Sequence, residues 1–166
     1  MTNNDMLRRL RYTFDLNDSK VISIFALAGK QVTREEISDW LKKPDNAAFK
    51  SCNDSTFATF LNGFIVERRG AREGPAAPIE KKLTNNIIFR KLKIALNLQA
   101  EEVLSILAAG GSEISKHELS AFFRKTGHKH YRQCKDQVLR NFLYGLQLKY
   151  RDEKPDASAD GFSWGE

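Results

Sequence analysis

The chain has 166 residues, of which 41% are hydrophobic and 11 are Phe, so it carries enough apolar side chains to form a hydrophobic core. That composition excludes a disordered chain, and no run of apolar residues is long enough to span a membrane. The net charge is +6, and the first residues lack the basic and apolar segments of a signal peptide, so we expect a basic, cytoplasmic protein.

The sequence contains the same pattern twice, at an offset of 82 positions. Thr2-Asn3-Asn4 aligns with Thr84-Asn85-Asn86, and Cys52 aligns with Cys134, without any gap. More than a quarter of the aligned pairs are identical. Self-similarity of this kind indicates that one supersecondary unit has been duplicated.

The repeats cover residues 2–69 and 84–151. Between them, residues 70–83 are rich in Gly, Pro and Ala and have no apolar period, which is typical of a linker. Residues 152–166 contain five acidic side chains and one Lys, and we expect them to form a disordered acidic tail.

Each repeat predicts four helices in the same order. The first helix begins at the Asn pair, and the second ends at a glycine that can adopt positive φ, Gly29 or Gly111. The third begins at a capping box, in which a hydroxyl residue precedes a Glu by three positions: Thr33 with Glu36, and Ser115 with Glu118.

The fourth helix has the clearest apolar period of the four. Phe57, Phe60, Leu61 and Phe64 lie on one helical face, and Asp54 occupies the expected N-cap position, as Asp136 does in the second repeat. We therefore predict an all-α protein, formed by tandem duplication of a four-helix unit, with about eight helices.

A glycine stands inside the fourth helix of both repeats, at Gly63 and Gly145. Glycine at such a position costs about 1 kcal/mol relative to Ala. The favoured explanation is that another helix packs close to the backbone there, and the alternative is a ligand that approaches it.

The two cysteines occupy equivalent positions of the two repeats, so we expect them to be buried, reduced and far apart. His128, His130 and Cys134 could bind a metal, but they are too few for a structural zinc site and their spacing fits no zinc pattern. The sequence also lacks a nucleotide-binding glycine motif and a catalytic signature, so we predict no metal, no cofactor and no enzymatic activity, although an enzyme acting on a small molecule is not excluded.

Charge distinguishes the two copies. Residues 2–69 hold 11 basic and 9 acidic side chains, whereas residues 84–151 hold 12 and 5. Basic side chains mixed with an aromatic ring are typical of surfaces that bind nucleic acid, since Lys and Arg neutralise phosphates and a ring can stack on a base. The candidate contacts are Arg124, Lys125, Lys129, Tyr131, Arg132, Lys135 and Arg140.

Two other interpretations, one of the helix order and one of the basic stretch, remain open. The second and third helices are ordered as in a helix-turn-helix, but the aromatic content of the third leaves few polar positions to contact base edges. The basic stretch is also compatible with ordinary solvated surface.

Several duplicated motifs resemble the YehS-like family of duplicated bacterial proteins of unknown function. They are the Thr-Asn-Asn opening with its basic helix, the capping boxes, and the Phe-Leu-x-Gly segments that end at Gly63 and Gly145. The resemblance covers residues 2–151 and implies a helical, cytoplasmic, tandem-repeat protein without transferring any catalytic residue.

The sequence therefore favours a non-enzymatic binding protein whose basic second repeat contacts nucleic acid. The alternative is a protein-interaction adaptor that holds an acidic or helical partner between the repeats, or at the equivalent basic positions Arg8 and Arg90. An exposed apolar groove would favour the adaptor.

Overall fold

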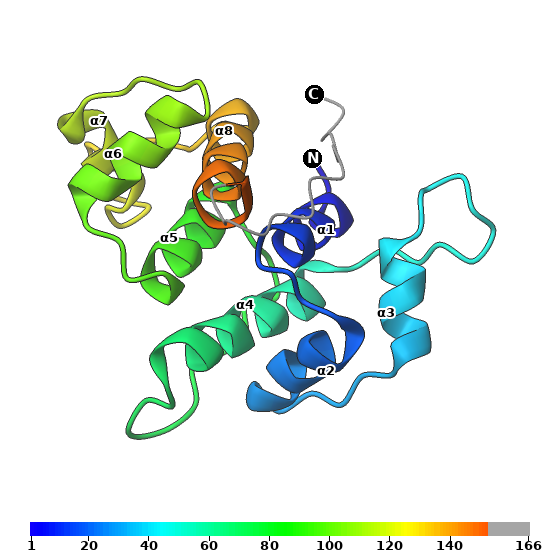
Figure 1. Ribbon diagram of the computed structural model, residues 1–166. Helices are drawn as coiled ribbons and strands as arrows, with labels where there is room; N and C mark the ends of the chain where they lie inside the picture. The colour runs from blue at the N-terminus through cyan, green and yellow to red at the C-terminus, as the bar shows by residue number, and fades with distance from the viewer. Residues whose placement is uncertain (153–166) are drawn as a thin grey trace.

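The computed structural model describes residues 1–152, so nearly all of the predicted acidic tail lies outside the described residues. Within that range the chain forms eight α-helices, one π-helical turn and no strand (Figure 1). The elements are α1 (Asn3–Thr13), α2 (Asp18–Leu27), α3 (Arg34–Leu41), α4 (Asp54–Arg69), α5 (Asn85–Ala95), α6 (Ala100–Ala109), α7 (Lys116–Phe122), α8 (Asp136–Gln147) and η1 (Leu148–Asp152). The predicted all-α duplication is confirmed. None of these helices is long and apolar enough to cross a lipid bilayer.

The two repeats share one hydrophobic core. Helix α4 packs on α2 of its own repeat and on α5 of the other, while α8 packs on α6 and on α1 (Figure 1). A shift of 82 residues converts the first set of contacts into the second, so the repeats are related by an approximate two-fold axis. Phe57, Phe60 and Phe64 of α4 are fully buried in the same cluster as Phe89 and Phe142.

A pair of equivalent arginines connects the repeats. The Arg69 guanidinium donates to the backbone oxygen of Ile94 at 3.0 Å and to the side chain of Asn97 at 3.1 Å. Its counterpart Arg151 donates to the Tyr12 oxygen at 3.0 Å and to Asp15 at 3.3 Å. Asn97 and Asp15, themselves equivalent, both adopt positive φ at the end of the first helix of their repeat. The same connection is therefore made twice.

The two glycines at equivalent positions of the fourth helices lie where two helices cross closely. A Cβ atom built on Gly63 would stand 1.9 Å from the backbone oxygen of Ile24 in α2, and one on Gly145 would stand 2.1 Å from that of Ile106 in α6. Real Cβ atoms do not approach an oxygen so closely, and the neighbouring atom belongs to a backbone that cannot rotate away. In both places, the helix–helix contact occupies the space that a side chain would need.

Both capping boxes are present. The Thr33 and Ser115 hydroxyls accept from the backbone N–H of Glu36 and Glu118, whose carboxylates accept in return from the capping residue. The hydrogen bonds that Glu118 receives from Ser115 lower the pKa of its carboxyl.

The prediction that Asp54 and Asp136 are N-caps is wrong. The N-cap of α4 is Asn53, whose side chain accepts from the N–H of Thr56, and that of α8 is Lys135, whose side chain has no hydrogen-bond acceptor. Asp54 instead accepts from Asn3 at 2.8 Å and from the N–H of Leu83, in the linker, at 2.8 Å. In the second repeat, Asp136 accepts from Asn85 at 2.7 Å, and this bond lowers the pKa of the Asp136 carboxyl.

Cys52 and Cys134 are free and buried. Burial, together with the nearby Asp54 or Asp136, raises the pKa of both thiols to about 12.

Because the thiolate is the reactive form, neither cysteine thiol should react with Ellman's reagent in the native protein at neutral pH, and both should react in denaturant. Rapid reaction of one thiol per native chain would contradict this burial.

Candidate nucleic-acid interface and apolar groove

The predicted phosphate contacts cluster in one loop, residues 123–135, which joins α7 to α8 and is called here the basic loop. The buried side-chain amide of Asn86, in α5, holds the basic loop in place. Its Nδ2 donates to the backbone oxygens of Phe122 at 2.9 Å and Arg132 at 2.8 Å, and its Oδ1 accepts from the N–H of Cys134 at 2.9 Å. The loop is thus attached to α5 near both of its ends.

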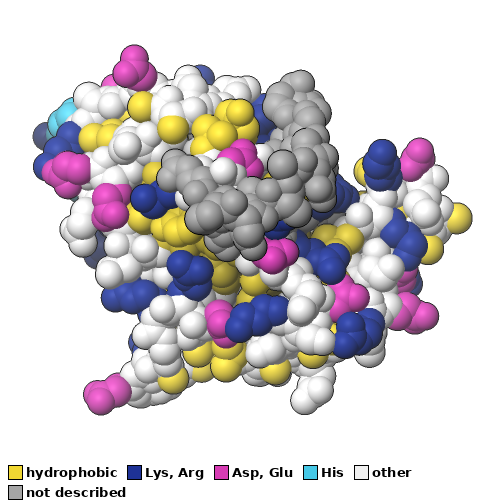
Figure 2. Space-filling model, viewed as in Figure 1, with side chains coloured by type: hydrophobic (Ala, Val, Ile, Leu, Met, Phe, Trp, Pro, Cys, Tyr) yellow, Lys and Arg dark blue, Asp and Glu magenta, His cyan; other side chains and the backbone are white. Residues whose placement is uncertain are grey.

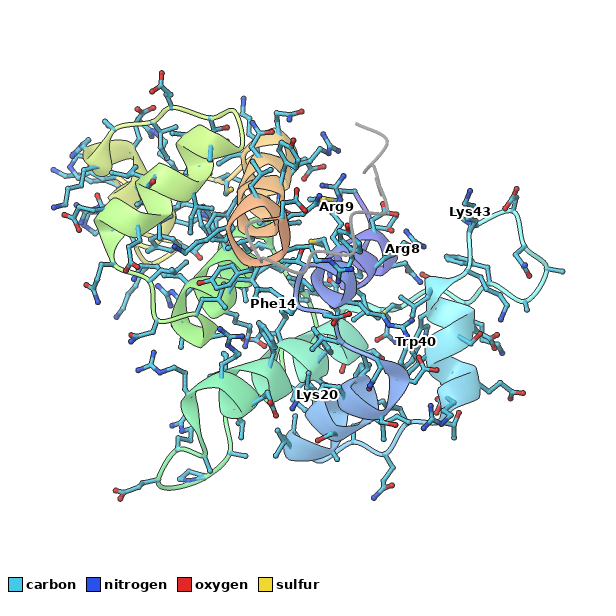
Figure 3. All side chains as sticks on the ribbon, in the orientation of Figure 1. Arg8, Arg9, Phe14, Lys20, Trp40 and Lys43 are labelled. Carbon is cyan, nitrogen blue, oxygen red and sulfur yellow. The ribbon has the colours of Figure 1, made fainter. Side chains whose placement is uncertain are left out.

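The first repeat builds the same loop with different charge. Asn4 donates to the backbone oxygens of Trp40 and Lys50 and accepts from the N–H of Cys52, at 2.8 to 2.9 Å. The loop that it holds, residues 42–53, lies on the opposite side of the molecule (Figure 1). Lys43 points outward from this loop, whereas Arg8 and Arg9 lie on α1 (Figure 3). The duplicated Asn residues therefore support the loops, and the loop sequences set their charge.

Lys125, Lys129, Arg132 and Lys135 of the basic loop are exposed, whereas Arg124, Tyr131 and Arg140 are half-buried. Within the described part of the chain, none of the six cations lies within 4.0 Å of a carboxylate. Arg140 bonds to Gln137 at 3.0 Å, and the Nε of Arg124 is buried without a hydrogen-bond partner. Figure 2 shows Lys and Arg side chains beside a histidine at the margin of the second repeat.

Arg8 and Arg90, the equivalent basic positions on the first helices, bind within their own repeats. Arg8 donates to the backbone oxygens of Leu41 and Lys42 at the end of α3 and pairs with Asp5 at 3.2 Å. Arg90 donates to the oxygen of Phe123 at 2.7 Å, at the end of α7. Both guanidiniums therefore satisfy carbonyls that a helix end leaves without partners.

The three residues considered as metal ligands do not converge. The rings of His128 and His130 lie 5.5 Å apart on the surface, and the His128 Nδ1 accepts from the backbone N–H of His130 at 3.0 Å. Cys134 is buried below them. No group of three candidate ligands gathers anywhere in residues 1–152.

A second feature is a groove of about 660 Å³ between α4, α5, the end of α2 and the linker. Its lining includes Leu27, Ile65, Val66, Ile79, Ile87 and Ile94. Hydrophobic side chains are visible near α4 and the end of α2 along the lower edge of the molecule (Figure 2).

A groove between the repeats belongs to the alternative that the sequence offers, but the sequence does not indicate which residues line it. Its walls come from α4, α5, the end of α2 and the linker. The linker sequence shows no apolar period, so it gives no sign of this role. The one available signal was the contrast between equivalent positions, where Ile87 and Ile94 of α5 correspond to Asp5 and Tyr12 of α1.

The fold and these surfaces define a class of protein: a duplicated helical protein whose repeats share one core. The chain belongs to the family described as "Protein of unknown function (DUF1456)", whose model matches residues 3–70 and 85–152. It is 39% identical over 155 residues to "Uncharacterized protein YehS" of Escherichia coli strain K12, an alignment that covers 93% of this chain and 99% of that protein. The resemblance to the YehS-like family is thus confirmed. No solved structure gave a significant match.

Proposed function

We propose that this protein is a non-enzymatic nucleic-acid-binding protein that uses the basic loop and the adjoining Arg140 of α8. The observation that carries the proposal is that, in residues 1–152, no carboxylate oxygen lies within 4.0 Å of the six cations of this region. Cations that are not neutralised within the protein can exchange their counterions for phosphates, which favours binding through released counterions.

The charge of the loop makes the proposal specific to the second repeat, because Asn4 holds the loop of the first repeat in the same way. A loop held near both ends by Asn86 presents its cations with less loss of conformational freedom on binding than a mobile loop would. Half-buried Tyr131 is the aromatic side chain available there to stack on an unpaired base. The mechanism is phosphate neutralisation with weak sequence preference.

The test is binding of fluorescent single-stranded and double-stranded oligonucleotides to the full-length protein, measured by anisotropy across a salt series. One variant changes four exposed cations of the basic loop to Ala: Lys125, Lys129, Arg132 and Lys135. A control variant removes the same charge elsewhere, by changing the exposed Lys43, Lys50, Lys81 and Lys82 to Ala.

We expect micromolar binding at low salt that the loop variant weakens by at least about tenfold, with a smaller loss in the control. For double-stranded DNA, the slope of log K against log salt should fall in magnitude by about 3.6 in the loop variant, since each of the four lost phosphate contacts removes about 0.9. Absence of binding by the wild type at low salt, or equal losses in the two variants, would overturn the proposal.

A further inference from the structure

The large apolar side chains that are exposed in residues 1–152 all line this groove. Leu27 at the end of α2, Ile79 in the linker and Ile94 in α5 are 44%, 41% and 42% exposed, and all three line the groove. Isolated exposed apolar residues are ordinary, but apolar residues that gather on one surface mark a binding site.

Repeat packing does not require this apolar lining. The positions equivalent to Leu27 and Ile65 hold Ala109 and Gln147 in the other copy, and those equivalent to Ile87 and Ile94 hold Asp5 and Tyr12. The contact between α8 and α1 in the other copy therefore carries a smaller or more polar residue at these four positions, although Leu148 stands where the groove has Val66. The apolar character belongs to this groove and not to the fold.

Four charged residues line the groove: Arg72, Glu80, Arg90 and Lys91. Lys91 is buried in its wall, where it donates to Asn62 and pairs with Glu80 at 3.1 Å. This pair is neutral as a whole. Arg72 and Arg90 are exposed, and neither is paired with a carboxylate among residues 1–152. The charge that the groove offers to a partner is therefore positive.

We infer that this groove binds an acidic amphipathic segment of another protein, whose apolar side chains contact Leu27, Ile79 and Ile94 and whose carboxylates face Arg72 and Arg90. A protein segment fits better than a small molecule because the groove is edged by side chains that are about 40% exposed, whereas small ligands are usually enclosed over most of their surface. An amphipathic helix that places apolar residues in a groove and charges at its rim is a common mode of recognition. The groove and the nucleic-acid surface share no residue, and the link between them is Arg90, which lines the groove and donates to the backbone oxygen of Phe123 at the start of the basic loop.

The experiment is selection from a displayed library of random 16-residue peptides on the full-length protein, with counter-selection on the variant carrying Leu27→Ser and Ile94→Ser. Because both side chains are exposed, the variant should keep its fold, and circular dichroism with urea unfolding checks this. We expect enriched peptides that combine apolar residues at helical spacing with Asp or Glu.

The selected peptides are then titrated against defined variants. The double Ser variant should bind them at least about tenfold more weakly, because central apolar contacts usually dominate such interfaces. Arg72→Glu should weaken them about fivefold at low salt, whereas Lys43→Glu, which changes the net charge equally, should have a smaller effect. Arg90 is left unchanged in this test, because it also donates to the backbone oxygen of Phe123. This last comparison separates local recognition from general attraction by a basic protein.

Three results would overturn the proposal. The first is a library that yields no peptide preferring the wild type, or one that yields basic peptides. The second is a concentration-dependent dimer in sedimentation that the double Ser variant abolishes, because the occupant would then be a second copy. The third is competition by a synthetic peptide of residues 153–166, which would assign the groove to the chain's own terminus. None of these results bears on the oligonucleotide experiment.

Discussion

Replacing Gly63 with Ala is expected to destabilise the protein by about 3 kcal/mol, a large effect for one added methyl group. The new Cβ would lie 1.9 Å from the Ile24 backbone oxygen, so α2 and α4 must separate. Ala is the better helix former by about 1 kcal/mol, so propensity alone predicts a change in the opposite direction. The measurement is urea unfolding followed by circular dichroism, with the free energy taken by linear extrapolation.

Two further glycines complete the test. Gly145→Ala places its Cβ 2.1 Å from the Ile106 oxygen and should have a similar effect. Gly127, in the basic loop, has no atom within 4 Å of its ideal Cβ position, and Gly127→Ala should change the stability by less than about 0.5 kcal/mol. A stable Gly63→Ala variant would show that the two helices do not cross as closely as described.

Local patterns in the sequence were sufficient to predict the helices. The apolar period and the capping boxes depend on residues close together in the chain, and the duplication repeats both. Thr33 with Glu36 illustrates how directly such a pattern specifies a helix start. The close approach at Gly63 could also be predicted, because a glycine retained in both copies of a helix needs a packing reason.

The prediction of Asp54 as an N-cap was wrong because two adjacent residues, Asn53 and Asp54, were both suitable for the position. Their side chains differ in partners that come from distant parts of the chain, with Asp54 bound to Asn3 and to the backbone of Leu83. Sequence spacing gives no information on such partners. A one-residue error at a helix end is the usual result.

How the repeats meet could not be predicted, because it depends on which helix of one repeat lies on which helix of the other. Arg69 and Arg151 align with each other in the two repeats, yet no residue near them in the sequence indicates that Asn97 and Asp15 accept their hydrogen bonds. The residues that line the groove beside Ile94 could not be predicted for the same reason. The basic loop, by contrast, is continuous in sequence, and its charges were visible before the fold was known.

Replacing Asn86 with Ala is expected to destabilise the protein by about 3 kcal/mol, because each of several buried polar groups left without a partner costs about 1 to 3 kcal/mol. The substitution would leave the backbone oxygens of Phe122 and Arg132 and the N–H of Cys134 without the Asn86 side chain. Asn86→Asp should be no milder, since an acceptor oxygen would then face two carbonyl oxygens. Urea unfolding measures the loss, and a change below about 0.5 kcal/mol would contradict the assigned role of Asn86.

The equivalent variant, Asn4→Ala, distinguishes the support of a loop from its charge. Asn4 makes the same three hydrogen bonds in the first repeat, so the loss of stability should be similar. Oligonucleotide binding, measured under conditions where both variants are folded, should weaken in Asn86→Ala and stay near wild type in Asn4→Ala, because Asn86 contacts the basic loop and Asn4 does not. Equal binding by the two variants would show that the cations act without a fixed loop, and nucleic-acid contact would then depend on their number rather than on their arrangement.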